Sequence, residues 1–84
     1  MMKYDYLELH ILTPERLVYE GGVDNVFMPG KKGEFQILPN HAPIISSLVE
    51  GDIRYRIDER VESVHISGGF VKMIGYKVFA CVDI

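Results

Sequence analysis

The sequence has little of several residue types on which common functions depend. Its 84 residues include one cysteine, Cys81, two alanines and no tryptophan. A single cysteine cannot form an internal disulfide framework, and this indicates a reducing, cytoplasmic setting. The longest apolar run, residues 78–82, has five residues, whereas a membrane-spanning helix needs roughly 20. The first residues also lack the apolar stretch of a secretory signal, so neither export nor direct membrane insertion is expected.

Positive charge is also in short supply. Nine Lys and Arg stand against 12 Asp and Glu, which gives a net charge of −3 and a pI of about 5.5. A nucleic-acid partner is not expected, because binding to phosphates requires a surplus of basic side chains. The only adjacent basic pair is Lys31 and Lys32. We interpret it as a solvated turn, because the glycines around it lack the spacing of a phosphate-binding loop.

β-Branched residues are abundant, and the apolar residues follow a period of two. Valine and isoleucine occur nine times each, and such side chains fit a pleated sheet but crowd a helix. In residues 6–11, Leu7, Leu9 and Ile11 share one face. In residues 52–58, three apolar side chains alternate with two Asp and two Arg. This alternation predicts half-buried strands, since a helix would scatter the charges around its circumference.

The rest of the chain divides into further short strands separated by turn residues. Strands are predicted at residues 17–20, 23–28, 34–38, 61–67, 70–74 and 77–82. Breaks are predicted at Gly21-Gly22, Pro29-Gly30, Gly33, Gly51, Ser67-Gly68-Gly69 and Gly75, with a corner at residues 13–16 and a hairpin at residues 58–60. No long window has helical spacing. We therefore predict an all-β fold, a two-layer antiparallel β-sandwich or flattened barrel of about 8–10 short strands, as a single domain over residues 1–84.

No constellation of residues predicts catalysis or metal binding. The candidate metal ligands His10, His41, His65 and Cys81 include no close pair at the usual spacing. His10 and His65 occupy strand positions opposite an apolar face, and Cys81 is interpreted as a small core residue. The serines at 46, 47 and 67 lack the strand–turn–helix setting of an exposed nucleophile. The sequence therefore predicts no catalytic residue, no metal and no cofactor.

One segment differs from ordinary turn sequence. Residues 33–45 end a strand in two prolines, Pro39 and Pro43. Each proline fixes its own φ and biases the preceding residue toward extended geometry, and Asn40 between them tolerates left-handed backbone. The result should be a stiff, protruding loop that carries His41. Two interpretations remain open, a rigid crossover between the sheets and a preformed recognition surface.

Five short motifs occur in a fixed order along the chain. They are Leu12-Thr13-Pro14-Glu15; Pro29-Gly30 followed by Gly33-Glu34-Phe35; Ile37-Leu38-Pro39-Asn40-His41-Ala42-Pro43; Leu48 with Gly51; and Ser67-Gly68-Gly69-Phe70. In this order and spacing the chain resembles the amino-terminal β-sandwich domain of the epsilon subunit of F-type ATP synthase. The resemblance covers essentially all 84 residues. Each motif alone would be weak, and it is their order that is specific.

The resemblance implies a non-catalytic rotor subunit of the central stalk. Such a subunit binds the gamma subunit, rests on the ring of proton-carrying subunits and helps to couple proton translocation to ATP synthesis. It would be peripheral, at the cytoplasmic face of the bacterial inner membrane. Ring loops in the family tend to be basic, so a glutamate there could form a charge-assisted contact, although a glutamate beside a turn is commonly only solvated. Carried over by position, the implied ring contacts are Glu34, Pro39, Asn40 and His41, and the implied gamma-subunit contacts are Thr13, His41 and Ser46.

Two departures from the family are expected to matter. Full-length relatives carry a carboxy-terminal helical hairpin that can inhibit the enzyme and in some members binds ATP. This sequence ends at Ile84, at the end of the sandwich, so neither the hairpin nor an ATP site is expected within it. Gln36 and Asn40 stand where many relatives have glycine. Gln36 adds a side chain to an exposed strand, which leaves room for a different docking geometry.

Two other hypotheses fit the size of the chain. A biotinyl or lipoyl carrier domain would display a modified lysine, and Lys72 is the nearest candidate. Lys72, however, falls within a strand pattern rather than at a hairpin tip. A small ligand-binding β-sandwich is compatible with the composition, but there is no tryptophan and no evident aromatic platform to support it.

Overall fold

The computed structural model describes residues 3–84, which form nine β-strands and no helix. The strands are β1 (Leu7–Leu12), β2 (Leu17–Val23), β3 (Asn25–Gly30), β4 (Gly33–Ile37), β5 (Ile44–Leu48), β6 (Gly51–Ile57), β7 (Arg60–Ile66), β8 (Gly68–Ile74) and β9 (Lys77–Asp83). The predicted all-β class and the number of strands are confirmed. None of the described residues belongs to a helix that could cross a bilayer.

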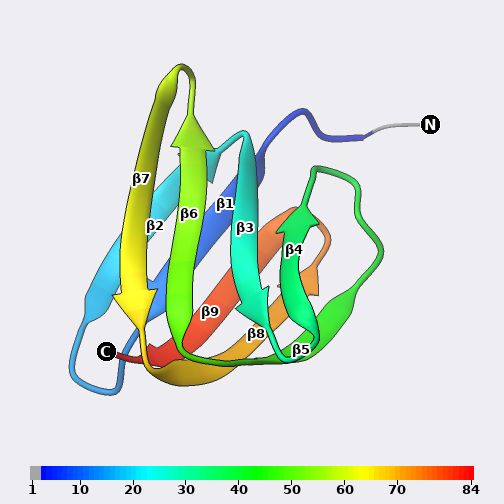
Figure 1. Ribbon diagram of the computed structural model, residues 1–84. Helices are drawn as coiled ribbons and strands as arrows, with labels where there is room; N and C mark the ends of the chain where they lie inside the picture. The colour runs from blue at the N-terminus through cyan, green and yellow to red at the C-terminus, as the bar shows by residue number, and fades with distance from the viewer. Residues whose placement is uncertain (1–2) are drawn as a thin grey trace.

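The strands form two layers (Figure 1). The hydrogen-bonded order is β2-β1-β9-β8-β5-β3-β6-β7, with β4 paired to β3. The front layer in Figure 1 holds β4, β3, β6 and β7, and the rear layer holds β2, β1, β9, β8 and β5. The layers connect where β5 meets β3 through the single register pair Leu48 and Gly30. All pairs are antiparallel except β1 with β9, which run in the same direction. Because these strands lie at opposite ends of the sequence, no tight hairpin constrains them to run antiparallel.

The core lies between the layers and consists of the inward-facing side of each alternating strand. Leu7, Leu9 and Ile11 of β1 are fully buried, as the alternation predicted. Ile53 and Tyr55 of β6 meet them from the other layer within the same cluster. Within residues 3–84 the buried hydrophobic side chains are Leu7, Leu9, Ile11, Val23, Val26, Met28, Ile37, Leu48, Ile53, Tyr55, Ile66, Val71, Met73, Val78, Ala80 and Val82. Residues 3–84 contribute no buried polar or charged residue, so the stability of this core rests on apolar packing.

Several predicted breaks are in fact parts of strands. Gly21-Gly22 lies within β2, opposite Leu9 and Glu8, and Gly68-Gly69 opens β8 instead of forming a tight turn. At Gly69 φ is +145°, and a Cβ atom there would collide with the carbonyl oxygen of Cys81 on β9. The glycine is therefore needed because two backbones approach closely, and local turn chemistry is not its role.

Other strand boundaries also differ from the prediction. Pro29-Gly30 ends β3 and Gly51 opens β6, so neither is a break. Strand β5 was not predicted at all, because its sequence Ile-Ile-Ser-Ser-Leu has no clear alternation.

Two predicted corners are confirmed. At residues 13–16 the Thr13 hydroxyl accepts hydrogen bonds from the backbone N–H groups of Glu15 (3.3 Å) and Arg16 (3.1 Å). The Thr13 N–H donates to the Arg16 carbonyl at 2.9 Å. The β6–β7 hairpin turns on two residues, and Asp58 adopts left-handed backbone with φ of 56°. Short polar side chains tolerate this conformation best.

Candidate docking surfaces

The proline-braced loop forms a projecting tip at residues 38–43, between β4 and β5 (Figure 1). The His41 N–H donates to the Leu38 carbonyl at 3.2 Å. Between them Asn40 has φ of 68°, so the predicted left-handed backbone is confirmed. Proline followed by a residue with positive φ is the sequence of a type II turn. Most of the tip is exposed, with Pro39 half-buried, and its shape is fixed before any partner arrives.

The exposed Asn40 side chain is hydrogen-bonded to the backbone of Lys3 and Tyr4. Its Oδ1 accepts from the N–H groups of Lys3 (2.9 Å) and Tyr4 (3.1 Å), and its Nδ2 donates to the Tyr4 carbonyl at 2.6 Å. These three hydrogen bonds, which we call the clip, join residues 36 and 37 positions apart. The backbone of Lys3 and Tyr4, in the N-terminal segment (residues 3–6), is thereby held against the tip. The ring contact implied for Asn40 stays a prediction.

Glu34, the second residue of β4, forms an ion pair within the chain. Its Oε2 accepts a hydrogen bond from Nη2 of Arg54 on β6 at 2.7 Å. The Arg54 guanidinium also lies over the ring of Phe27, 4.7 Å from its centroid. The side chains of Arg54 and Glu34 are 42% and 47% exposed, so the pair contributes little stability. Its main effect is to hold the carboxylate in one place, which goes beyond the simple solvation considered for a glutamate beside a turn.

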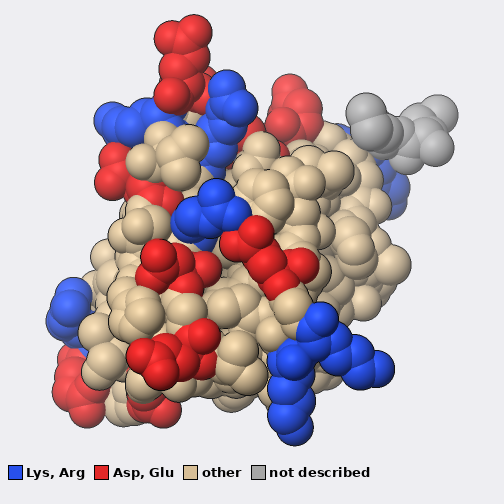
Figure 2. All heavy atoms as spheres, viewed as in Figure 1, with Lys and Arg blue, Asp and Glu red and all other residues tan. Residues whose placement is uncertain are grey.

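Ser46 and Glu34 line one shallow hollow of about 500 Å³. It lies between β5 and the β3–β4 turn, which carries Lys31 and Lys32. Ser46 is half-buried, and its neighbour Ile45, which also lines the hollow, is 81% exposed. Figure 2 shows basic side chains projecting at this lower edge, below acidic groups on the same face. The hollow therefore combines both signs of charge with hydroxyl groups.

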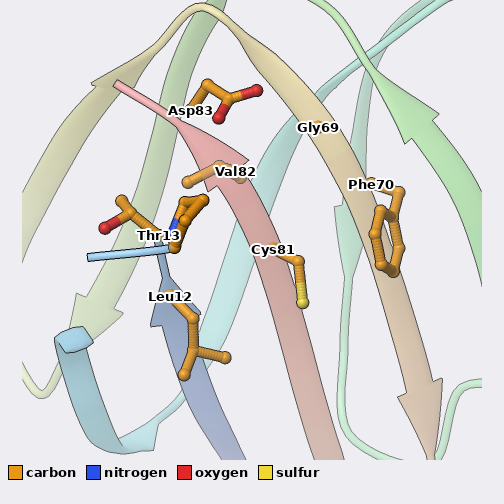
Figure 3. A pocket seen from close by; sticks show the side chains of 8 residues that line it. Leu12, Thr13, Gly69, Phe70, Cys81, Val82 and Asp83 are labelled. Atoms are coloured by element: carbon orange, nitrogen blue, oxygen red, sulfur yellow. The ribbon is translucent and has the colours of Figure 1, made fainter. Parts of the chain in front are cut away.

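Thr13 lies at one end of an apolar groove on the outer face of the rear layer. Leu12, Cys81 and Phe70 form a row across β1, β9 and β8, because Cys81 is paired with both of the others. Figure 3 shows Leu12 and Phe70 on either side of Cys81, with Thr13 and Asp83 beyond them. The groove measures about 410 Å³ and is completed by Pro14, Gly69 and Val82. Gly69 of β8, which has no side chain, lies next to Phe70 in this lining.

The predicted contact residues do not gather at one point. His41 belongs to the tip, which is bonded to the segment before β1, whereas Thr13 follows the end of β1. The six residues of β1 therefore separate them by about 20 Å. Ser46 lies with Glu34 in the lining of the hollow, which includes neither His41 nor Thr13. The implied contacts are thus spread over three places, namely the tip, the hollow and the groove.

The groove was missed because Cys81 was taken for a core residue, and that interpretation is wrong. In β9 the buried residues are Val78, Ala80 and Val82, so Phe79 and Cys81 point outward. The uninterrupted apolar run at residues 78–82 concealed the period of two. Strict alternation, combined with the outward positions of Leu12 and Phe70, would have predicted an apolar outer face.

Titratable groups elsewhere in the fold form pairs and triplets on the surface. His65 on β7 contacts Asp52 (Nδ1–Oδ1, 2.7 Å) and Glu50 (Nε2–Oε2, 3.3 Å). Its hydrogen bond with Asp52, followed by that with Glu50, raises the pKa of His65 above its usual value. His10 contacts Glu8 at 2.7 Å. In the described part of the chain no three His, Cys, Asp or Glu side chains are placed to share a metal ion.

Lys72, the candidate for a carrier lysine, lies in the middle of β8. It is paired with Phe79 on one side and Ile45 on the other. Carrier domains display their lysine at a hairpin tip, so this position gives the carrier hypothesis no support.

The sequence of the chain is similar to a known family of protein domains. The sequence profile described as "ATP synthase, Delta/Epsilon chain, beta-sandwich domain" matches residues 6–83. A protein named ATP synthase epsilon chain from Carboxydothermus hydrogenoformans is 46% identical over 74 residues, 88% of this chain and 55% of the relative. A protein of the same name from Desulfitobacterium hafniense is 44% identical over 75 residues, 89% of this chain and 57% of the relative. The chain thus spans about half the length of these relatives.

Solved structures share the fold at low sequence identity. A chain in the mitochondrial ATP synthase of Euglena gracilis, solved with OSCP, F1 and the c-ring, superposes with a TM-score of 0.88 at 17% identity. The match covers 94% of this chain and 51% of that one. A chain from the central stalk and c-ring of Tetrahymena thermophila mitochondrial ATP synthase gives 0.78 at 14% identity, covering 100% and 67%. These likenesses establish the fold of the sandwich.

Proposed function

The chain belongs to the β-sandwich family of ATP synthase delta and epsilon chains, and on that premise we propose that it is a non-catalytic subunit of the central stalk. In this role it links the gamma subunit to the proton-carrying ring and helps to couple proton translocation to ATP synthesis. The protein would then be peripheral to the membrane, at the cytoplasmic face of the bacterial inner membrane. The relatives' name and the central-stalk complex that contains one structural neighbour support this assignment.

The apolar groove is the observation that carries the proposal. Leu12, Cys81 and Phe70 face outward from a layer whose other side already fills the core. Phe70 is 48% exposed, and an aromatic side chain at the rim of an apolar hollow is typical of a protein-binding surface. We assign the gamma subunit to this groove, because Thr13, an implied gamma contact, lies at its end.

The ring is assigned to the edge that carries Glu34 and the tip. Glu34 stands at the beginning of β4 and Pro39–His41 follow its end, so one short strand carries the implied ring contacts. A basic ring loop that approaches Glu34 must share the carboxylate with Arg54 or displace it. The rigid sandwich suits the transmission of torque, since a close-packed core resists deformation.

A binding experiment with the gamma subunit tests the proposal. The chain and the gamma subunit of the same organism are co-expressed and examined by native mass spectrometry at micromolar concentration. The Phe70→Asp variant should bind roughly 30-fold more weakly, because a charge replaces an aromatic side chain that the partner would bury. Val61→Asp is the matched control. Val61 is also apolar and 61% exposed, but it lies on β7 in the other layer.

The outcomes separate the two parts of the assignment. If the unaltered chain forms no complex with gamma, the stalk function is contradicted. If a complex forms but Phe70→Asp and Val61→Asp bind equally well, gamma docks elsewhere and the groove is not its site. Urea unfolding of both variants establishes that each remains folded.

A further inference from the structure

The clip between Asn40 and the N-terminal segment joins two parts of the surface that the sequence separates. All three hydrogen bonds involve backbone groups of the segment: the N–H groups of Lys3 and Tyr4 donate, and the Tyr4 carbonyl accepts. Asn40 therefore recognises the path of this segment and not its side chains. A glycine would adopt the same left-handed backbone without strain, so the asparagine amide supplies something that the turn itself does not need.

The other side of the N-terminal segment packs on the β8–β9 turn. The Tyr4 ring lies 4.9 Å from that of Tyr76, and the Tyr6 ring lies 5.7 Å from it, centroid to centroid. The Glu8 N–H donates to the Tyr76 carbonyl at 2.8 Å, which fixes the turn against the start of β1. The segment is thus held between the tip and Tyr76.

These contacts join the tip to the N-terminal segment at Lys3 and Tyr4, and the segment to Tyr76. Large apolar side chains are exposed on both parts: Leu38 of the tip is 50% exposed, and Tyr6 of the segment is 44% exposed. Tyrosine offers a large apolar body and a polar hydroxyl, and it is enriched where proteins dock. A segment that is already ordered loses less entropy when a partner binds.

We propose that Asn40 is a positioning residue that fastens residues 3–6 to the tip, and that this segment forms part of the surface that contacts the polar loops of the proton-carrying ring. The second half rests on the proposed function. The first half concerns the chain alone and can be measured without the ring.

The test compares three variants of the chain. Asn40→Gly keeps the left-handed turn but removes the whole clip. Asn40→Asp keeps an oxygen that accepts from Lys3 and Tyr4 but loses the donor to the Tyr4 carbonyl. Asp58→Gly is the matched control, because Asp58 also has positive φ, 56°, but lies in the β6–β7 turn.

Two quantities are measured for each variant. Amide hydrogen exchange reports whether the N–H groups of Lys3 and Tyr4 are protected. Affinity for the detergent-purified ring of the same organism reports docking. Asn40→Gly should lose the protection and bind the ring about tenfold more weakly, since the segment must then be ordered on binding. Asn40→Asp should fall between it and the unaltered chain, and Asp58→Gly should change neither quantity.

Each outcome decides a separate point. Full amide protection in Asn40→Gly would show that the clip does not hold the segment. Lost protection with unchanged ring affinity would show that the segment lies outside the docking surface. If the unaltered chain does not bind the ring, the ring assignment of the proposed function is contradicted, while the exchange data still test the clip.

Discussion

Two phenylalanines on opposite outer faces of the sandwich differ in how far they are covered by other residues of the chain. Phe27 on β3 is half-buried and covered by the Arg54 guanidinium, 4.7 Å from its centroid. Phe70 on β8 is 48% exposed at the rim of the apolar groove. Both point outward from strands with the same alternation. Phe27 is therefore covered by a charged residue of its own layer, whereas Phe70 remains open on the outer face of the rear layer.

The difference shows where to look for partners in a small β-sandwich. The inward positions of both layers are occupied by one apolar cluster. These residues stabilise the fold and give no information about partners. Outward positions carry the functional information, because an apolar residue there is costly to expose unless it is buried on binding. The row Leu12, Cys81 and Phe70 meets this criterion, whereas Glu34 and Arg54 neutralise each other in water.

The largest loss in the free energy of unfolding is expected at Gly69, where β8 and β9 approach each other closely beneath the groove. Gly69→Ala places a Cβ against the Cys81 carbonyl and the Val82 backbone, in addition to imposing positive φ on alanine. We expect a loss of about 3 kcal/mol in the free energy of unfolding, from backbone strain and overpacking together. Urea denaturation measures it.

Gly33→Ala in the front layer is the matched control. Gly33 also has positive φ, +123°, but a Cβ there meets nothing within 4 Å. Only the backbone strain remains, so the loss should be about 1–2 kcal/mol. Equal losses for the two variants would mean that the close approach under the groove is unimportant.

Much of this architecture could be predicted from local sequence, and the reasons are specific. Residues 6–11 and 52–58 alternate strictly, so their buried faces were identified correctly. The turn at Asp58 and the left-handed Asn40 follow from the conformational tolerance of short polar side chains. These features depend on a few neighbouring residues, which a single sequence displays.

The features that were missed depend on distant partners. The parallel pairing of β1 with β9 joins the first and last strands, and the clip links Asn40 to residues 36 and 37 positions away. Gly69 resembles a turn residue until β9 is placed beside it. Cys81 was misplaced because an uninterrupted apolar run carries no signal of which side faces the core.

A smaller effect is expected for the ion pair that distinguishes the front layer. A double-mutant cycle with Glu34→Gln and Arg54→Gln should give a coupling of about 0.5 kcal/mol in low salt, because both side chains are nearly half exposed. The coupling should shrink in high salt through screening. Chemical denaturation of the four proteins measures it. A coupling above about 2 kcal/mol would mean that the pair is far less solvated than its exposure indicates.

The smallest effect is expected in the pH dependence of the free energy of unfolding, and it arises from His65 in the front layer. The hydrogen bonds of His65 with Asp52, and then with Glu50, raise its pKa above the ordinary value, so the folded state holds the proton more tightly than the unfolded state. The stabilisation should be complete below about pH 6.5 and lost as the pH rises through the folded pKa of His65. Because the imidazole is solvent-exposed, added salt should weaken the effect.

NMR titration of the His65 ring gives its pKa in the folded chain, and unfolding curves of the chain and of His65→Gln at several pH values give the change in stability. A His65 pKa at or below 6.5 in the folded chain would contradict the arrangement, and an unchanged pH profile in His65→Gln would assign the dependence to another group.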